Sequence, residues 1–269
     1  MKTGTGVKAT VFLGGGRITS ALVAGLRLAK YDKPIVVHDR NPQKLRQLKK
    51  RYGVTVEPIL HQAVAQAGLL IIAVRPDSVS ELVQQIEINR PLAAISLAAG
   101  IPLSKLRARL GSPLRWARAM PSPVCRYGRG LTALIFDRTF SRSARREVRG
   151  LFEQVGTVLE IPESQFDAFT VTYSSSHGYH ALATLAASAQ TLGLSRKTAL
   201  IAAAHALADG ILSWRDSKIP LAQLLHEATT PGGIAAAAMN AMDSFGYERI
   251  IERGLRAGIA QARKNAKQV

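Results

Sequence analysis

Uninterrupted apolar runs alternate with helical patterns over the first part of the chain. The clearest runs lie at 10–13, 34–38, 69–74 and 92–97, and the segments 115–120, 131–136 and 157–161, which include polar residues, also fit strands. A strand covered on both faces is apolar throughout, so each run predicts a buried strand. Between the first two runs, Ile18, Leu22 and Leu26 recur every four residues, as one face of a helix requires. Strands that alternate with helices predict an α/β fold with a doubly wound, mostly parallel sheet.

The pattern changes at Pro162. Alanine and leucine dominate from there on, and helices are predicted at 163–172, 177–192, 195–214, 221–228, 234–245 and 247–267. We therefore expect two domains, a sheet domain at 1–161 and an all-helical domain at 162–269. The segment 199–208 is apolar nearly all round and must be covered on every side. This half is too short to cover it alone, which predicts interleaved helices in a homodimer or higher homo-oligomer.

The first strand enters the first helix through Gly14-Gly15-Gly16, followed by Arg17 and Ile18. Such a turn lets the backbone approach a pyrophosphate, and the free amides at the helix start supply donors. Glycine is usual at the third position of this fingerprint, but Thr19 stands there, so we expect helix and strand to pack less closely. The turn predicts a Rossmann-type dinucleotide site, although a plain glycine-rich connection remains an alternative.

The second strand ends at Asp39, Arg40 and Asn41, where a dinucleotide fold reads the adenosine ribose. An acid at this place accepts hydrogen bonds from the free ribose hydroxyls, whereas an arginine binds the extra phosphate of NADPH. Arg40 carries a planar, fixed charge that suits phosphate, so NADPH is favoured and NADH is possible. Asn41 also fits a helix cap with Pro42 in the first turn.

Two later strand ends complete the predicted cofactor crevice. The third long strand stops at Ala73, Val74, Arg75 and Pro76, and small residues, Ala98 and Ala99, follow the fourth. Carboxyl ends of parallel strands meet at one edge of a sheet, and ligands bind there.

Composition narrows the choice of partners. The net charge of +18 permits nucleic-acid binding, but the basic residues are scattered and only 6% of residues are aromatic. We expect no nucleic-acid partner. The rival interpretation, a basic nucleic-acid-binding protein, predicts affinity for DNA that falls steeply with salt. No apolar segment approaches the ~20 residues that span a membrane, and residues 1–8 lack the apolar centre of a signal peptide. We therefore expect a soluble, cytoplasmic protein. The histidines show no metal-binding spacing, so no metal is expected.

Several motifs together resemble the pyrroline-5-carboxylate reductase family, which reduces a cyclic imine to proline with a nicotinamide cofactor. The matching segments run in the family's order: 12–16 with 20–22, 73–76, 96–101, 118–121, 128 with 130–132, 166–168 and 230–233. The resemblance implies a first domain that holds NADPH or NADH, a helical dimerisation domain, and a small imine substrate between the two.

The departures from the family lie where its substrate binds. Its serine-glycine turn is replaced by 174–179, and the hydroxyl residues after its Pro-Gly-Gly are replaced by Ile234 and Ala235. Hydride reduction of an imine needs a proton for nitrogen and donors for a carboxylate, and hydroxyl groups or backbone amides can suffice. The candidates for these roles are Thr230, Ser176, His177 and Tyr179. A helix cap explains Thr230 equally well, and His177 at a helix start is more often a cap or a surface residue; a cofactor-binding relative with another substrate or no catalysis remains the alternative.

Overall fold

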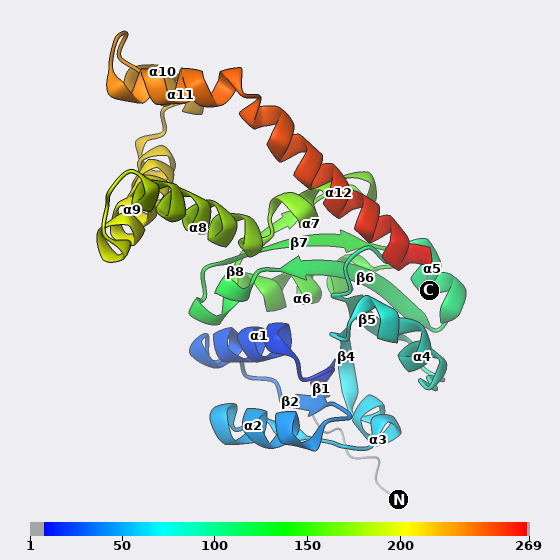
Figure 1. Cartoon of the computed structure of the whole chain (residues 1–269). Helices are drawn as coiled ribbons and strands as arrows, with labels where there is room; N and C mark the ends of the chain where they lie inside the picture. The colour runs from blue at the N-terminus through cyan, green and yellow to red at the C-terminus, as the bar shows by residue number, and fades with distance from the viewer. Residues whose placement is uncertain (1–7, 268–269) are drawn as a thin grey trace, which may run out of the picture. The chain divides into compact units, whose positions relative to one another are not determined.

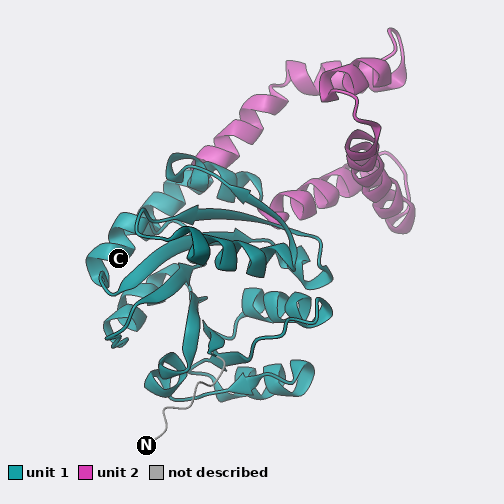
Figure 2. Cartoon of the chain, turned by 180° about the vertical axis from the view of Figure 1, so that it is seen from behind, with its two compact units in different colours: residues 1–173, 258–269 teal, residues 174–257 magenta. Residues whose placement is uncertain are grey.

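The structure is a computed structural model that describes residues 8–267 and contains two compact units. Unit 1 holds residues 1–173 and 258–269, and unit 2 holds residues 174–257 (Figure 2). The predicted change from strands to helices occurs where expected, because helix α7 spans Glu163–Thr172. However, α7 and the end of α12 (Tyr247–Lys267) belong to the unit that contains the sheet. The N-terminal segment assessed for a signal peptide lies, apart from Lys8, outside the described residues.

Unit 1 is built on one eight-stranded sheet with the order β3-β2-β1-β4-β5-β6-β7-β8. Neighbouring strands run parallel except β6 and β7, which are antiparallel, so the mostly parallel sheet is confirmed. The strands are β1 (Ala9–Leu13), β2 (Ile35–His38), β3 (Thr55–Val56), β4 (Ala67–Ile72), β5 (Leu92–Ser96), β6 (Leu114–Pro121), β7 (Gly130–Phe136) and β8 (Gly156–Glu160).

Helices cover both faces of this sheet, which is why its strands are largely apolar (Figure 1). Along β1, Phe12 packs into one core cluster, whereas Val11 and Leu13 pack into the other. The first cluster includes buried residues of α1 (Arg17–Leu28), α2 (Pro42–Tyr52) and α6 (Arg142–Glu153). The second includes residues of α3 (Leu60–Ala65), α4 (Val79–Gln84), α5 (Leu103–Arg109) and α7. Short 3-10 helices lie at Pro76–Ser78 (η1) and Pro123–Tyr127 (η2).

Thr19 takes part in the glycine turn, and the looser packing of α1 on the strand that was expected at Thr19 stays a prediction. The Thr19 side chain is fully buried and its hydroxyl donates a hydrogen bond to the carbonyl of Gly14 at 2.5 Å, which closes the glycine turn. The close backbone approach occurs later on α1, at Gly25, where a Cβ atom would lie 2.1 Å from the carbonyl oxygen of Cys125. Burial raises the pKa of the Cys125 thiol to about 12, so this cysteine is a packing residue rather than a reactive one.

Unit 2 is helical and buries few of its side chains. It contains α8 (Ser175–Thr191), α9 (Arg196–Ser217), α10 (Leu221–Ala228), α11 (Ile234–Ser244) and the first part of α12. Helices α8 and α9 pack against each other, with Ala186, Ala199 and Ala203 buried. Many large apolar side chains of the unit stay exposed, among them Leu200, Ile201, Ile211, Leu212, Trp214, Leu225 and Phe245. Between residues 8 and 267, no helix is both long and apolar enough to cross a membrane.

A buried arginine joins α7 to the sheet. Arg118 on β6 is 2% exposed, and its Nη1 donates a hydrogen bond to Oε1 of Glu163 at 3.2 Å. Its Nη2 lies 3.6 Å from Oδ1 of Asp167, and the guanidinium lies 4.2 Å from the centre of the Phe166 ring. Burial lowers the pKa of this guanidinium, although Asp167 and Glu163 act in the opposite direction. One strand residue therefore contacts three residues of α7.

We expect Arg118→Met to destabilise unit 1 by about 2–4 kcal/mol, because it leaves two carboxylates near the core without their counter-ion. The loss should fall short of that for a fully buried pair, since the carboxylates are about a third exposed. Urea unfolding followed by circular dichroism measures it. The matched control is Arg149→Met, which breaks exposed pairs with Glu153 and Glu160 and should lose far less. Equal losses for the two variants would contradict this account.

Candidate functional site

The glycine turn begins where β1 contacts its two neighbouring strands. The amide of Gly14 donates a hydrogen bond to the carbonyl of His38 on β2 at 2.8 Å, and the amide of Ala73 donates to the carbonyl of Leu13 at 2.8 Å. Gly14 has a φ of +110°, and a Cβ atom there would lie 2.6 Å from the carbonyl oxygen of Ala73. Both the backbone conformation and the close contact therefore require glycine at this position.

Gly16 has the opposite surroundings. It is the N-cap of α1, its φ is an ordinary −77°, and a Cβ atom there would meet no atom within 4 Å. No side chain caps this helix start, so its first amides have no side-chain partner. A free helix N-terminus beside open space is the arrangement in which dinucleotide folds hold a pyrophosphate.

Asp39 connects the end of β2 to the glycine turn. Its Oδ2 accepts a hydrogen bond from the Gly15 amide at 2.7 Å, and its Oδ1 accepts one from the Asn41 amide at 2.8 Å. Lys44 Nζ lies 3.4 Å from Oδ2. Burial alone would raise the pKa of the Asp39 carboxyl, but the amides of Asn41 and Gly15 and the charge of Lys44 bring it below its ordinary value. Asp39 is therefore ionised at neutral pH and holds the turn in place.

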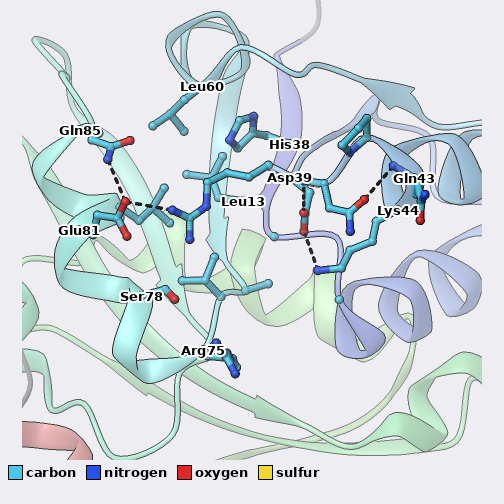
Figure 3. A pocket seen from close by; sticks show the side chains of 18 of the residues that line it. Leu13, His38, Asp39, Gln43, Lys44, Leu60, Arg75, Ser78, Glu81 and Gln85 are labelled. Carbon is cyan, nitrogen blue, oxygen red and sulfur yellow. Dashed lines mark hydrogen bonds and ion pairs between the residues drawn. The ribbon is translucent and has the colours of Figure 1, made fainter.

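A cavity of about 970 Å³ opens at this edge of the sheet. Its walls come from the glycine turn, the start of α2, the segment after β4, and α4. Figure 3 shows Glu81 and Gln85 on one side and Asp39 with Lys44 on the other. Basic residues outnumber acidic ones in its lining, which contains Arg40, Lys44, Arg46 and Arg75 against Asp39 and Glu81. Apolar Leu60 and Leu82 also line it. The volume is within the range of small-molecule and cofactor sites.

Eight of the predicted cofactor residues line this cavity: Gly14, Gly16, Asp39, Arg40, Asn41, Ala73, Val74 and Arg75. The predicted cap is also present, because the Asn41 side chain accepts a hydrogen bond from the Gln43 amide at 2.9 Å, with Pro42 in the first turn of α2. Gly15, Arg17 and Pro76 are each adjacent in the sequence to a residue of the lining, but neither they nor Ile18 line the cavity, so the contact of these four residues with a cofactor stays a prediction.

The small residues after β5 lie against the chain's own last helix. A Cβ atom on Gly100 would lie 2.4 Å from the carbonyl oxygen of Ala262 on α12, and Asn265 Nδ2 lies 3.5 Å from the Ala99 carbonyl. Ala98 is buried, and neither Ala98 nor Ala99 lines the cavity. Small side chains at this place therefore admit a helix backbone, and a role in cofactor binding stays a prediction.

The four predicted substrate residues all belong to unit 2 and are exposed. Ser176, His177 and Tyr179 lie in the first two turns of α8, which begins at Ser175, two residues before the predicted start. Ser174 caps that helix, because its hydroxyl accepts a hydrogen bond from the Ser176 amide at 3.4 Å. His177 is therefore not the cap, and its role in proton transfer stays a prediction.

Thr230 lies in the turn between α10 and α11. Its carbonyl accepts a hydrogen bond from the Gly233 amide at 2.9 Å, and α11 begins only at Ile234 with Gly233 as its N-cap. The alternative explanation of Thr230 as the side-chain cap of this helix is therefore wrong. Its side chain is exposed, as a contact with a ligand would require. Within the described residues, no group of three or more histidine, cysteine or acidic side chains could hold a metal ion.

Sequence reasoning missed the wall of the cavity formed by α4. Glu81, Leu82 and Gln85 line the cavity, but no helix was predicted between Pro76 and Pro91. A signal existed, because Val79, Leu82 and Val83 have the spacing of one helical face and two of them are buried. The helix is only six residues long, which is too short for this periodicity to stand out.

A parallel sheet whose first strand enters a helix through glycines, with an acid and an arginine after the second strand, defines a dinucleotide-binding protein. Comparison with known families agrees in both halves of the chain. Residues 10–100 match the family described as NADP oxidoreductase, coenzyme F420-dependent, and residues 163–265 match pyrroline-5-carboxylate reductase dimerisation. The chain belongs to the pyrroline-5-carboxylate reductase family.

Individual relatives support this membership over nearly the whole chain. The pyrroline-5-carboxylate reductase of Mycobacterium leprae is 30% identical, with 91% of this chain and 92% of that protein covered. The one from Thermus thermophilus is 33% identical, with 87% and 89% covered. The crystal structure of the Plasmodium falciparum enzyme with NADP bound is 20% identical and has a TM-score of 0.85, covering 98% of this chain and 100% of that one. At that identity the structural match shows a shared fold.

Alanine substitutions at Gly14 and Gly16 separate a glycine that the backbone requires from one beside which there is room for a Cβ atom. Gly14→Ala should cost at least about 1–3 kcal/mol, because alanine is strained at positive φ and its Cβ would meet Ala73. Gly16→Ala should fold nearly normally, since its φ is ordinary and its Cβ meets no protein atom. We expect Gly16→Ala to lose dinucleotide binding, because the methyl group takes the place of a phosphate. Thermal unfolding and NADPH titration of both variants test this, and a stable Gly14→Ala would contradict it.

Proposed function

We propose that this chain is an NAD(P)H-dependent reductase that reduces the carbon–nitrogen double bond of pyrroline-5-carboxylate, or of a closely related imine acid, with NADPH as the preferred cofactor. The observation that carries the proposal is the glycine turn that opens into the basic 970 Å³ cavity, in a chain of this family. The names of the relatives support pyrroline-5-carboxylate as the substrate. The residues that line the cavity support NADPH as the cofactor.

The cavity fits the adenosine and pyrophosphate end of a nicotinamide dinucleotide. Gly16 and the first amides of α1 would hold the pyrophosphate, because the space beside Gly16 is open. Leu60 and Leu82 offer apolar surface for the adenine base. Arg40 lies next to the ribose-reading acid and offers a guanidinium to a 2′-phosphate. The bound cofactor would supply the hydride, and the chain would supply position and charge.

We assign the substrate end to Ser176, His177, Tyr179 and Thr230. Hydroxyl groups and the imidazole could donate hydrogen bonds to a carboxylate or a proton to the imine nitrogen. Ile234 and Ala235 stand where the family carries hydroxyl residues, and Ile234 is 92% exposed in the single chain. The absence of these hydroxyl groups favours a substrate whose structure differs from that of pyrroline-5-carboxylate in the part that would contact α11. The cytoplasmic location expected from the sequence stays a prediction.

The direct test is NADPH oxidation, followed by absorbance, first with pyrroline-5-carboxylate and then with a panel of cyclic and acyclic imines. Turnover of pyrroline-5-carboxylate supports the proposal in full. Turnover of another imine, but not of pyrroline-5-carboxylate, would support the proposed reductase activity and assign it a different substrate. Cofactor binding without turnover on any imine would favour a relative that has lost catalysis.

For the cofactor, we expect Arg40→Ala to weaken NADPH binding about ten- to a hundredfold and to change NADH binding little. Only NADPH carries a 2′-phosphate that the guanidinium can bind, and a hydrogen bond between charged groups contributes about 1.5–3 kcal/mol. Fluorescence titration of both cofactors measures the two affinities. Arg51→Ala is the matched control, because Arg51 lies on α2 but does not line the cavity. An equal loss for both cofactors would exclude Arg40 as the phosphate ligand.

The dimerisation-domain match makes the chain a subunit of a homo-oligomer, and we propose that the oligomer is built on a two-fold dimer formed by unit 2. The exposed apolar side chains of α9 to α12 support this. Leu200, Ile201, Leu212 and Trp214 on α9 are each about half exposed, although a helix surface of this kind is usually covered.

Leu200→Asp should prevent this assembly and cause aggregation or unfolding, because it places an unpaired charge in the proposed interface. Multi-angle light scattering measures the mass of the particle. The matched control is Leu28→Asp, because Leu28 is 64% exposed against 50% for Leu200 but belongs to α1 of unit 1. A wild-type protein that runs as a monodisperse monomer of 28.9 kDa would show that these helices need no partner.

A further inference from the structure

An ion pair connects two walls of the cofactor cavity. Arg40 follows β2, whereas Glu81 lies on α4, and Nη1 of Arg40 is 2.9 Å from Oε1 of Glu81. Gln85 Nε2 also approaches this oxygen at 3.5 Å (Figure 3). Both partners of the ion pair line the cavity, and their side chains are 73% and 55% exposed. The guanidinium proposed for the 2′-phosphate therefore already has an acidic partner.

Glu81 differs from the other acid in the cavity. Both oxygens of Asp39 accept backbone hydrogen bonds, from Gly15 and Asn41, so displacing that carboxylate would disturb the turn itself. Among residues 8–267, the Glu81 carboxylate makes its polar contacts with the side chains of Arg40 and Gln85, and each contact can break by rotation of exposed groups. Glu81 is thus the acid that a ligand can exchange.

We propose that Glu81 sets the preference between NADPH and NADH by competing with the 2′-phosphate for Arg40. The inference rests on the proposed function, in which Arg40 takes that phosphate. A phosphate monoester carries about −1.5 to −2 charges at pH 7, so it binds a guanidinium more strongly than a single carboxylate does. NADPH must nevertheless displace Glu81 or bind beside its negative charge, whereas NADH leaves the pair intact. Glu81 therefore reduces the advantage of NADPH.

Glu81→Gln tests this with the least change of shape. Glutamine keeps the side-chain oxygen that accepts from Arg40 but removes the charge. We expect NADPH to bind about two- to fivefold more tightly, the range that exposed ion pairs span in mutant cycles, and NADH to change by less than twofold. The gain should shrink at high salt, because the pair is exposed to solvent.

The experiment is fluorescence titration of the full chain with NADPH and with NADH, at low and at raised salt. Glu87→Gln serves as the control, because it removes an equal charge from an exposed residue shortly after α4 that does not line the cavity. This control should leave both affinities unchanged. Tighter NADPH binding for Glu81→Gln alone supports the proposal, whereas weaker binding would mean that Glu81 positions Arg40 and would overturn it.

A second comparison tests whether the effect passes through Arg40. In an Arg40→Ala background, Glu81→Gln should change NADPH affinity by less than twofold, because the shared partner is gone. An effect of equal size in both backgrounds would overturn the competition. A wild-type chain that binds neither cofactor would refute the proposed function as well. A wild-type chain that binds NADPH, with Glu81→Gln unchanged, would refute this inference alone.

Discussion

The contact between Gly14 and the carbonyl of Ala73 determines how the cofactor cavity is built. Strand β1 lies between β2 and β4, and backbone hydrogen bonds tie its last residues to both neighbours. The chain must then leave the sheet at once to begin α1, and only a residue without a Cβ atom can do so at a φ of +110° beside that carbonyl. The carboxyl ends of β1, β2 and β4 therefore lie at the same edge of the sheet, and the uncapped start of α1 faces the cavity at that edge.

Positively charged side chains outnumber negatively charged ones around the cofactor cavity. The chain has 36 basic and 18 acidic residues, and the basic excess continues into the cavity. This excess attracts an anionic cofactor over distances of about a Debye length, which is ~8 Å at physiological salt. Affinity depends on shorter contacts, where Asp39 and Glu81 have different tasks. Asp39 fixes the backbone through its neighbours' amides, whereas Glu81 neutralises the arginine that the ligand would need.

Buried strands could be predicted from the sequence, but contacts between exposed side chains of distant segments could not. The long strands were predicted because a strand covered on both faces is apolar throughout, and Asn41 was predicted as a cap because its side chain and Pro42 act locally. The two-residue strand β3 and the short helices α4 and α5 carry too few periods to be recognised. Glu81 was missed for that reason, and its pair with Arg40 joins residues 41 positions apart. Contacts of that kind depend on the tertiary fold.

The contacts between Arg118 and α7 bring together two segments that are distant in the sequence. Segments 118–121 and 166–168 both resemble the family, and the structure brings Arg118 against Phe166 and Asp167. Apolar side chains at 118, 163 and 167 together could supply comparable stability, since a buried ion pair seldom exceeds a well-packed hydrophobic contact, whereas removing the arginine alone leaves two carboxylates unpaired. The arginine in addition restricts the orientation of α7, because its planar guanidinium must contact two carboxylates that lie one turn apart on the helix. These contacts therefore fix how α7 lies on the sheet, and the next helix in the chain, α8, carries Ser176, His177 and Tyr179.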